Sequence, residues 1–134
     1  MSQENVEVVE RAIAALNERD IDRYLGCCTD DVEVQTPWAD IGGVYEGTAA
    51  IRRLLADIGD TGPDFRLEVG CLESIGADQV LGSLRATASG RASGAPLVDD
   101  LPVTNIYDLA GGKIRRIRIF RDRQEALEAV GLSE

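Results

Sequence analysis

The N-terminal stretch Val6–Pro37, VEVVERAIAALNERDIDRYLGCCTDDVEVQTP, decides the fold that we expect for this chain. Apolar residues recur in its first half at spacings of three and four: Val6, Val9, Ile13 and Leu16. This pattern predicts an amphipathic helix that Ser2 can cap and that runs to about Arg19. Asp20 then predicts the cap of a second short helix, Ile21–Cys28.

Strands follow these helices, and one further helix separates the first strand from the rest. Alternation in Val32–Thr36 predicts a strand that Pro37 stops. Thr48 predicts the start of a third helix, Ala49–Ile58, which Gly59 closes. Four more strands are predicted by alternation and by turn residues: Phe65–Leu72, Gln79–Ala88, Leu101–Leu109 and Lys113–Arg121.

The remaining segments connect or finish this pattern. Ser89–Asp100 is rich in Gly, Ser, Ala and Pro and predicts a long hairpin loop. Asp122 predicts the cap of a final short helix, with Glu125 three residues later. Strands in succession without helices between them favour antiparallel hairpins. We therefore predict a single α+β domain over residues 1–134, a curved antiparallel or mixed sheet enclosed on its concave side by the N-terminal helices.

Three stretches carry a resemblance to a known family. They are Val6–Pro37, Gly43–Leu55 (GVYEGTAAIRRLL) and Gly112–Leu132 (GKIRRIRIFRDRQEALEAVGL). In this order and spacing they resemble the SnoaL-like branch of the nuclear transport factor 2-like superfamily. The resemblance implies a conical, cystatin-like α+β roll around one pocket. It does not imply one function, because relatives include ketosteroid isomerases, polyketide cyclases, limonene-epoxide hydrolases and proteins without enzymatic activity.

Composition excludes several classes of function. The formal net charge of −10 disfavours binding to nucleic acid or to anionic membranes. No apolar run approaches a membrane span, and the acidic, polar start lacks the features of a secretory signal, so we expect a cytoplasmic protein. Five arginines cluster late in the chain: Arg115, Arg116, Arg118, Arg121 and Arg123. They alternate with Ile117 and Ile119, which predicts the charged outer face of a strand rather than an anion site.

The chain contains no histidine and three cysteines, Cys27, Cys28 and Cys71. The lack of histidine removes Ser-His-Asp and Cys-His catalysis, zinc-hydrolase motifs and the histidine-bearing iron triad. No CxxC pair occurs, and we expect small, reduced cysteines. We therefore predict neither a metal site nor a cofactor.

The resemblance places unreactive residues where the known enzymes of the superfamily keep their polar groups. Against ketosteroid isomerases, Thr36 matches the base, Ala12 the tyrosine and Thr104 the neutral acid. Against limonene-epoxide hydrolases, Ile119 matches a catalytic aspartate, while the arginine and the other aspartate match Val80 and Gly82. The residues that hold the water match Val34 and Thr36. Neither mechanism is therefore expected here.

What remains is an apolar pocket with two hydroxyl groups. The side chains that we expect to face it are Val34, Thr36, Leu84, Thr104, Ile106, Ile117 and Ile119. Trp38 and Tyr45 are the aromatic residues nearest the expected mouth, and Trp38 is added to the predicted ligand-binding set. Asp122 is predicted to cap a helix and Asp40 to be solvated in a loop.

Three hypotheses follow for the function. The first is binding of a small, largely apolar, uncharged molecule, with the chemistry unassigned. The second is an isomerase or cyclase that uses an unidentified carboxylate, such as Asp122 or Asp40. The third is a non-catalytic interaction module. For the partner surface we predict a homodimer through the outer sheet face, lined by Leu81, Ser83, Arg85, Asn105, Tyr107, Arg116, Arg118 and Phe120.

Overall fold

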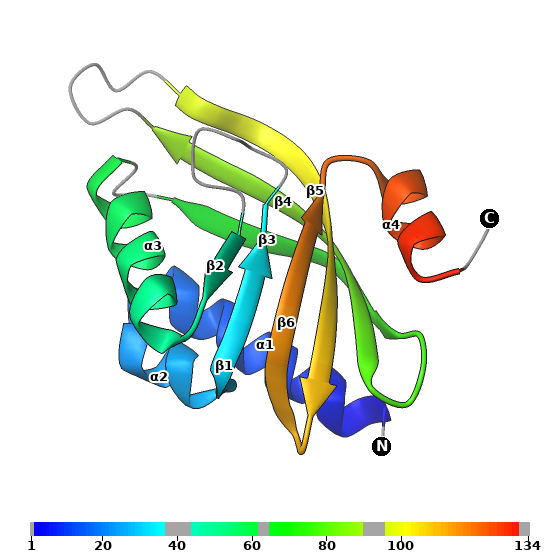
Figure 1. Cartoon of the computed structure of the whole chain (residues 1–134). Helices are drawn as coiled ribbons and strands as arrows, with labels where there is room; N and C mark the ends of the chain where they lie inside the picture. Colours follow the sequence, from blue (N-terminus) through cyan, green and yellow to red (C-terminus); the bar gives the residue numbers. More distant parts are fainter. Residues whose placement is uncertain (1, 37–43, 62–64, 90–95, 132–134) are drawn as a thin grey trace.

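The computed structural model describes the whole chain except residues 1, 37–43, 62–64, 90–95 and 132–134 (Figure 1). The helices are α1 (Ser2–Asn17), α2 (Ile21–Gly26), α3 (Thr48–Thr61) and α4 (Arg123–Ala129). The strands are β1 (Cys28–Gln35), β2 (Val44–Glu46), β3 (Arg66–Ser74), β4 (Gln79–Ser89), β5 (Pro96–Ala110) and β6 (Lys113–Phe120). Apart from the short strand β2, the order of elements is the one predicted from the sequence.

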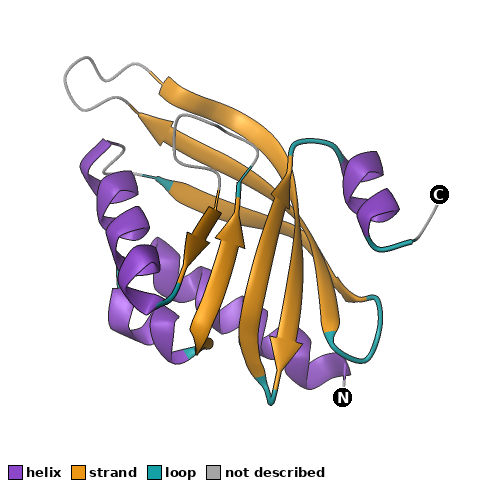
Figure 2. Cartoon of the chain, viewed as in Figure 1, coloured by secondary structure: helices purple, strands orange, loops and turns teal. Residues whose placement is uncertain are grey.

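The strands form one mixed sheet with the order β2-β1-β6-β5-β4-β3. β1 and β6 are parallel, and the other neighbouring strands are antiparallel. The sheet is strongly curved and does not close into a barrel (Figure 2). The prediction of an α+β fold with a curved mixed sheet is confirmed.

The two faces of the sheet bury different clusters. We call concave the face whose side chains pack with α1, α2 and α3, and it carries Val34, Leu84, Val103, Tyr107 and Ile117. We call convex the opposite face, where Leu81 and Ile106 pack under Ala126 and Leu127 of α4. Most of the buried apolar side chains belong to the concave cluster. The three N-terminal helices therefore cover the concave side, as predicted.

Helix α1 is fixed to the sheet near both of its ends by asparagines. Asn5 Nδ2 donates to the Ala77 carbonyl oxygen over 3.0 Å. Asn17 forms two bonds with Leu67 of β3, donating to its carbonyl over 2.8 Å and accepting from its N–H over 2.9 Å. The amide of Asn17 thus bonds both backbone groups of Leu67, as the backbone of a neighbouring strand would. These bonds hold α1 in place across the concave face.

The end of α1 is a Schellman turn with arginine in the left-handed position. Arg19 has φ of 63°, and the N–H of Asp20 donates to the Ala15 carbonyl over 2.9 Å. The Arg19 guanidinium donates to the carbonyls of Leu16 and Phe65. Asp20 caps α2 as predicted, since its Oδ1 accepts from the Arg23 N–H over 3.1 Å.

Several predicted boundaries need correction. The second helix ends at Gly26 rather than Cys28, because β1 begins at Cys28 to pair with Ile114. The third helix continues beyond Gly59, and Pro96–Asp100 extend β5 instead of forming part of a loop.

The alternation in β3 is interrupted at Gly70, between Val69 and Cys71, so these two residues do not share a face. Val69 pairs with Leu84 of the concave face, whereas Cys71 pairs with Ser83 of the convex one. A Cβ at Gly70 would lie 3.1 Å from the Ser83 carbonyl oxygen, which explains a glycine at this position. The strict alternation from which this strand was predicted would place Phe65, Leu67, Val69 and Cys71 on one face, and it fails at Cys71.

In the part of the chain that the structure describes, no helix is both long enough and apolar enough to cross a bilayer.

Candidate functional site

Strand β5 sends four alternate side chains to the concave face: Val103, Asn105, Tyr107 and Leu109. Val103, Tyr107 and Leu109 belong to the concave cluster, and alternation places Asn105 between them. Asn105 faces Gly82 of β4 and Ile119 of β6. Gly82 leaves room for its neighbours, since an added Cβ would lie 3.0 Å from Leu72 Cδ2 and 3.4 Å from Tyr107 Cε2.

Four of the predicted site residues lie on the concave face. Val34, Leu84 and Ile117 are buried in its cluster, and Ile119 packs against it partly buried. Val34 and Ile117 are direct partners in the parallel pairing of β1 and β6. Thr36 follows β1 and is partly buried. Trp38 and Asp40 lie outside the described residues. The structure thus brings four of the eight together, and their part in ligand binding stays a prediction.

The predicted inward positions of Thr104 and Ile106 are wrong. Ile106 is fully buried, but in the convex cluster with Leu81 and Leu127. Thr104 pairs with Ser83 and Phe120, on the same convex face. The error is a shift of one residue, and it reverses every side chain of the strand. Asn105 and Tyr107, which we expected on the dimer surface, therefore lie inside.

Asn105 and Tyr107 form a buried polar pair within the concave cluster. Asn105 Nδ2 donates to the Tyr107 hydroxyl oxygen over 3.0 Å. The two residues are 4% and 3% exposed. Asn105 Oδ1 is buried and accepts no hydrogen bond. Such an unsatisfied buried acceptor is unusual in a folded protein, and it marks this pair as the polar centre of the site.

The groups around this pair are uncharged near neutral pH. Burial raises the pKa of Tyr107 to about 12, although the hydrogen bond from Asn105 opposes the shift. Burial also raises the pKa of Tyr24, with further contributions from Cys28 and Tyr107. The thiol of Cys28 donates to the Tyr24 carbonyl over 3.4 Å, and burial raises its pKa to about 12. These side chains can donate hydrogen bonds, but they are poor proton acceptors or nucleophiles.

A cluster of charged side chains lies on the convex face. Asp108 accepts from Arg116 Nε over 2.8 Å and from Gln79 Nε2 over 2.7 Å, and Arg118 lies 3.3 Å away. Burial alone would raise the pKa of Asp108. The hydrogen bonds from Gln79 and Arg116 and the charge of Arg118 outweigh this effect and lower the pKa below its usual value. The predicted outward positions of Arg116 and Arg118 are confirmed.

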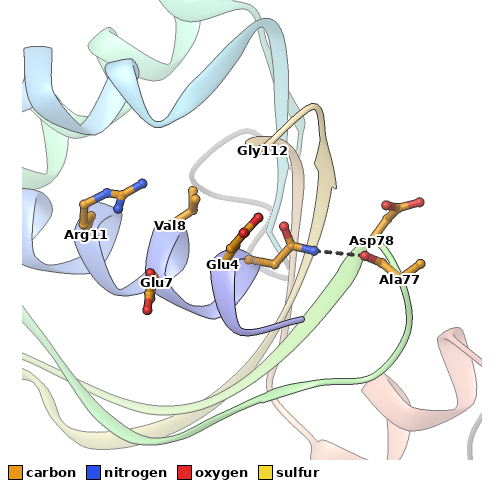
Figure 3. Close-up of a pocket in the computed structure, with 8 residues that line it drawn as sticks. Glu4, Glu7, Val8, Arg11, Ala77, Asp78 and Gly112 are labelled. Carbon is orange, nitrogen blue, oxygen red and sulfur yellow. Dashed lines mark hydrogen bonds between the residues drawn. The ribbon is translucent and has the colours of Figure 1, made fainter. Parts of the chain in front are cut away.

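A separate depression of about 420 Å³ lies where α1 begins (Figure 3). Glu4, Glu7 and Arg11 of α1 line it together with Ala77 and Asp78 of the turn before β4. This depression is lined mainly by polar residues, and Asn105 and Tyr107 do not line it. Within the described residues, no group of three or more Cys, Asp or Glu side chains is arranged to hold a metal ion.

The remaining candidates have structural roles. Asp122 caps α4, since its Oδ1 accepts from the Gln124 N–H over 2.8 Å, and it is exposed. This confirms the predicted cap and places Asp122 away from the concave pair. Tyr45 on β2 is partly buried against the concave cluster. The three cysteines are unpaired.

A curved mixed sheet with three helices on its concave side is a fold shared with solved structures described as nuclear transport factor 2-like proteins. The family model described as the SnoaL-like domain matches residues 9–117. The chain therefore belongs to the SnoaL-like domain family. No protein of curated function shows significant sequence similarity to it.

Solved structures agree with this assignment. The chain is 29% identical to an uncharacterized cystatin fold protein from Novosphingobium aromaticivorans, covering 87% of this chain and 97% of that one with a TM-score of 0.74. It is 22% identical to TerC co-crystallized with polyporic acid, with coverages of 93% and 96% and a TM-score of 0.77. A protein with a ketosteroid isomerase-like fold from Catenulispora acidiphila, in complex with trimethylamine, is 15% identical, with coverages of 95% and 94% and a TM-score of 0.75. The last two similarities concern the fold.

Proposed function

We propose that this SnoaL-like domain binds a small, largely apolar, uncharged molecule against the concave face of its sheet. The neutrality of that face is the observation that carries the proposal. Among the described residues, Asp108 is the one buried carboxylate, and it lies on the convex face with its own arginines. An ionised ligand group on the concave face would lack a partner, at a cost of several kcal/mol.

The proposed lining differs from the set predicted from the sequence. Val34, Leu84, Ile117 and Ile119 supply apolar surface. Thr36 is retained from the predicted lining, and Trp38 from the predicted mouth. Asn105 and Tyr107 take the inward positions predicted for Thr104 and Ile106, because β5 turns Asn105 and Tyr107 toward the concave face. They supply the polar groups of the proposed lining. The co-crystal of the similar protein TerC with polyporic acid supports the idea that this fold can hold a small organic molecule.

A matched pair of probes tests the proposal. Naphthalene and 2-naphthoate have the same ring system and differ by one ionised carboxylate. Trp38 is the single tryptophan of the chain, so its emission reports on one position. Naphthalene should change this emission saturably, and 2-naphthoate should bind at least ~30-fold more weakly because of the unpaired charge. Calorimetry checks both affinities independently of Trp38.

Two variants locate the binding. Ile119→Glu places a charge on the concave face and should weaken naphthalene binding by at least ~10-fold. Arg121→Glu changes an exposed residue just beyond β6 and should leave the affinity within ~2-fold. Equal binding of the two probes, or equal effects of the two variants, would contradict the proposal.

For the alternative of an isomerase or cyclase, no buried carboxylate of the described residues faces the concave side to act as the base. Tyr107 could donate to a developing oxyanion, but Ala12 and Thr36 cannot supply the groups of a ketosteroid isomerase. We therefore expect no turnover of a Δ5-3-ketosteroid or of limonene epoxide above background. Losing a general base alone typically costs a factor of roughly 10²–10⁴. Robust turnover in a coupled absorbance assay would establish this alternative instead.

For assembly we propose a homodimer through the convex face beside α4. The surface is Ser83, Arg85, Arg116, Arg118 and Phe120, without the inward residues Asn105 and Tyr107. It combines a partly buried aromatic ring with arginines, a composition typical of protein interfaces. Light scattering should report a dimer at tens of micromolar, and Arg85→Glu or Phe120→Glu should shift it toward monomer. A monomeric wild-type protein would contradict the dimer without affecting the binding proposal.

A further inference from the structure

The concave face contains one acceptor that the protein leaves unused. Asn105 Oδ1 is buried without a hydrogen-bond partner, in a residue that is only 4% exposed to solvent. Its neighbours across the sheet are Gly82 and Ile119, and neither side chain can donate a hydrogen bond to it.

Next to this acceptor lies an unused donor. The Tyr107 hydroxyl oxygen accepts from Asn105 Nδ2, so its own hydrogen points elsewhere. No acceptor for that hydrogen occurs among the hydrogen bonds of the described residues around Tyr107. The hydrogen bond between the two side chains fixes their relative orientation. The pair therefore offers one fixed acceptor and one donor side by side.

Neighbouring contacts hold this pair in place. The Tyr107 ring packs in the concave cluster, and Gly82 leaves the space that its edge occupies, since a Cβ added at Gly82 would lie only 3.4 Å from Tyr107 Cε2. Tyr107 also sits opposite Ile117 in the pairing of β5 and β6. A polar pair that is rigid, neutral and incompletely bonded is suited to orient a ligand within an apolar site.

We propose that Asn105 and Tyr107 select ligands whose uncharged polar end carries a hydrogen-bond donor next to an acceptor, as in a lactam or a hydroxy ketone. The ligand donor bonds Asn105 Oδ1, and the Tyr107 hydroxyl donates to the ligand acceptor. This inference rests on the proposed binding of an uncharged molecule to the concave face. It adds the chemical class of the ligand's polar end.

Three bicyclic probes of similar size test this selection. 2-Quinolinone has a lactam N–H next to its carbonyl, N-methyl-2-quinolinone keeps the carbonyl alone, and naphthalene has neither group. Isothermal titration calorimetry of the full chain should give about tenfold tighter binding of 2-quinolinone than of its N-methyl derivative. A ratio of affinities near one, with naphthalene bound, would overturn the inference and leave the proposed function standing. Failure of all three probes to bind would overturn both.

Variants assign the preference to the pair. In Asn105→Leu the ratio of affinities for 2-quinolinone and its N-methyl derivative should fall to about one. Thr104→Val changes the neighbouring buried residue on the convex face and should keep the tenfold ratio. Should Asn105→Leu fail to fold, Tyr107→Phe removes the donor and should weaken binding of both quinolinones relative to naphthalene. A ratio preserved in Asn105→Leu, or unchanged relative affinities in Tyr107→Phe, would contradict the assignment.

Discussion

The two faces of strand β5 treat their buried polar groups in opposite ways. On the convex face, Asp108 has three partners, Gln79, Arg116 and Arg118. On the concave face, Asn105 has a single side-chain partner and a bare acceptor oxygen. The carboxylate of Asp108 is satisfied and stabilises the fold, although Arg118 Nε in the same cluster is buried without a partner. The unsatisfied amide oxygen of Asn105, in contrast, adds nothing to stability. The contrast indicates that the convex side supports the sheet, and it favours the concave side as the one that receives a ligand.

The largest effect should come from breaking the convex cluster. Asp108→Ala leaves Arg118 with its charge largely buried and without its carboxylate, since that side chain is 15% exposed. Removing one partner of a buried pair typically costs about 3 kcal/mol or more. We expect a loss of about 3 kcal/mol in the free energy of unfolding, measured by urea denaturation.

An exposed ion pair provides the control for this loss. Glu73→Ala breaks the ion pair with Arg123. The side chain of Glu73 is 48% exposed and that of Arg123 is 44% exposed. This change should stay within about 0.5 kcal/mol. If both variants lost the same small amount, the convex cluster would not be the stabilising region of the sheet.

The pH dependence of stability should show the same cluster. The pKa of Asp108 is lowered by folding, so its contribution is present above the unfolded value of 3.8 and is lost as the pH falls through the lower folded value. The difference in unfolding free energy between wild type and Asp108→Asn should be constant from about pH 5 to 7 and shrink below about pH 4. A difference that instead grew on acidification would contradict the assigned direction.

A smaller loss of unfolding free energy is expected when a methyl group is added at Gly82, beside Asn105 and Tyr107. Gly82→Ala brings a methyl group 3.0 Å from Leu72 Cδ2 and 3.4 Å from Tyr107 Cε2. Leu72 can yield at the end of its side chain, so we expect a loss of about 1 kcal/mol in unfolding free energy. Binding of 2-quinolinone should weaken more than binding of naphthalene, because the Tyr107 hydroxyl is displaced. An unchanged ratio of the two affinities would show that the ring position does not matter.

A small effect on stability, of either sign, is expected for Asn105→Leu. Replacing the amide removes an unsatisfied buried acceptor together with one hydrogen bond, and these two changes oppose each other. Thermal unfolding should show a change of no more than about 1 kcal/mol in the free energy of unfolding, in either direction. Destabilisation as large as that of Asp108→Ala would mean that Asn105 is a structural residue and that the two faces do not differ in this way.

The fold could be predicted because the helices and most strands carry one clear apolar stripe. In β4, the alternation of Val80, Gly82 and Leu84 with Leu81 and Ser83 indicated the correct faces. The cap residues Asp20 and Asp122 were also recognisable from their positions before apolar periodic segments.

The site was predicted less well because β5 carries apolar residues on both of its faces. Tyr107 and Ile106 are equally plausible as inward residues, and α4 decides between them by covering Ile106 on the convex side. One signal in the sequence favoured the correct assignment of the β5 residues to the two faces of the sheet. Asp108 shares a face with Ile106, and the arginines of the next strand were already expected on the outside. Bulges at Gly70 and beside Arg115 shift the alternation by one residue, and a strict period of two does not reveal them.

The most direct test of ligand binding to the concave face is a ¹H–¹⁵N and methyl NMR titration with 2-quinolinone. We expect saturable shifts for the Asn105 side-chain amide and for the methyl groups of Leu84 and Ile117. The methyl groups of Ile106 and Leu127, buried on the convex face, should keep their chemical shifts. Shifts confined to Ile106 and Leu127, or no saturable shift at Asn105, would contradict binding to the concave face.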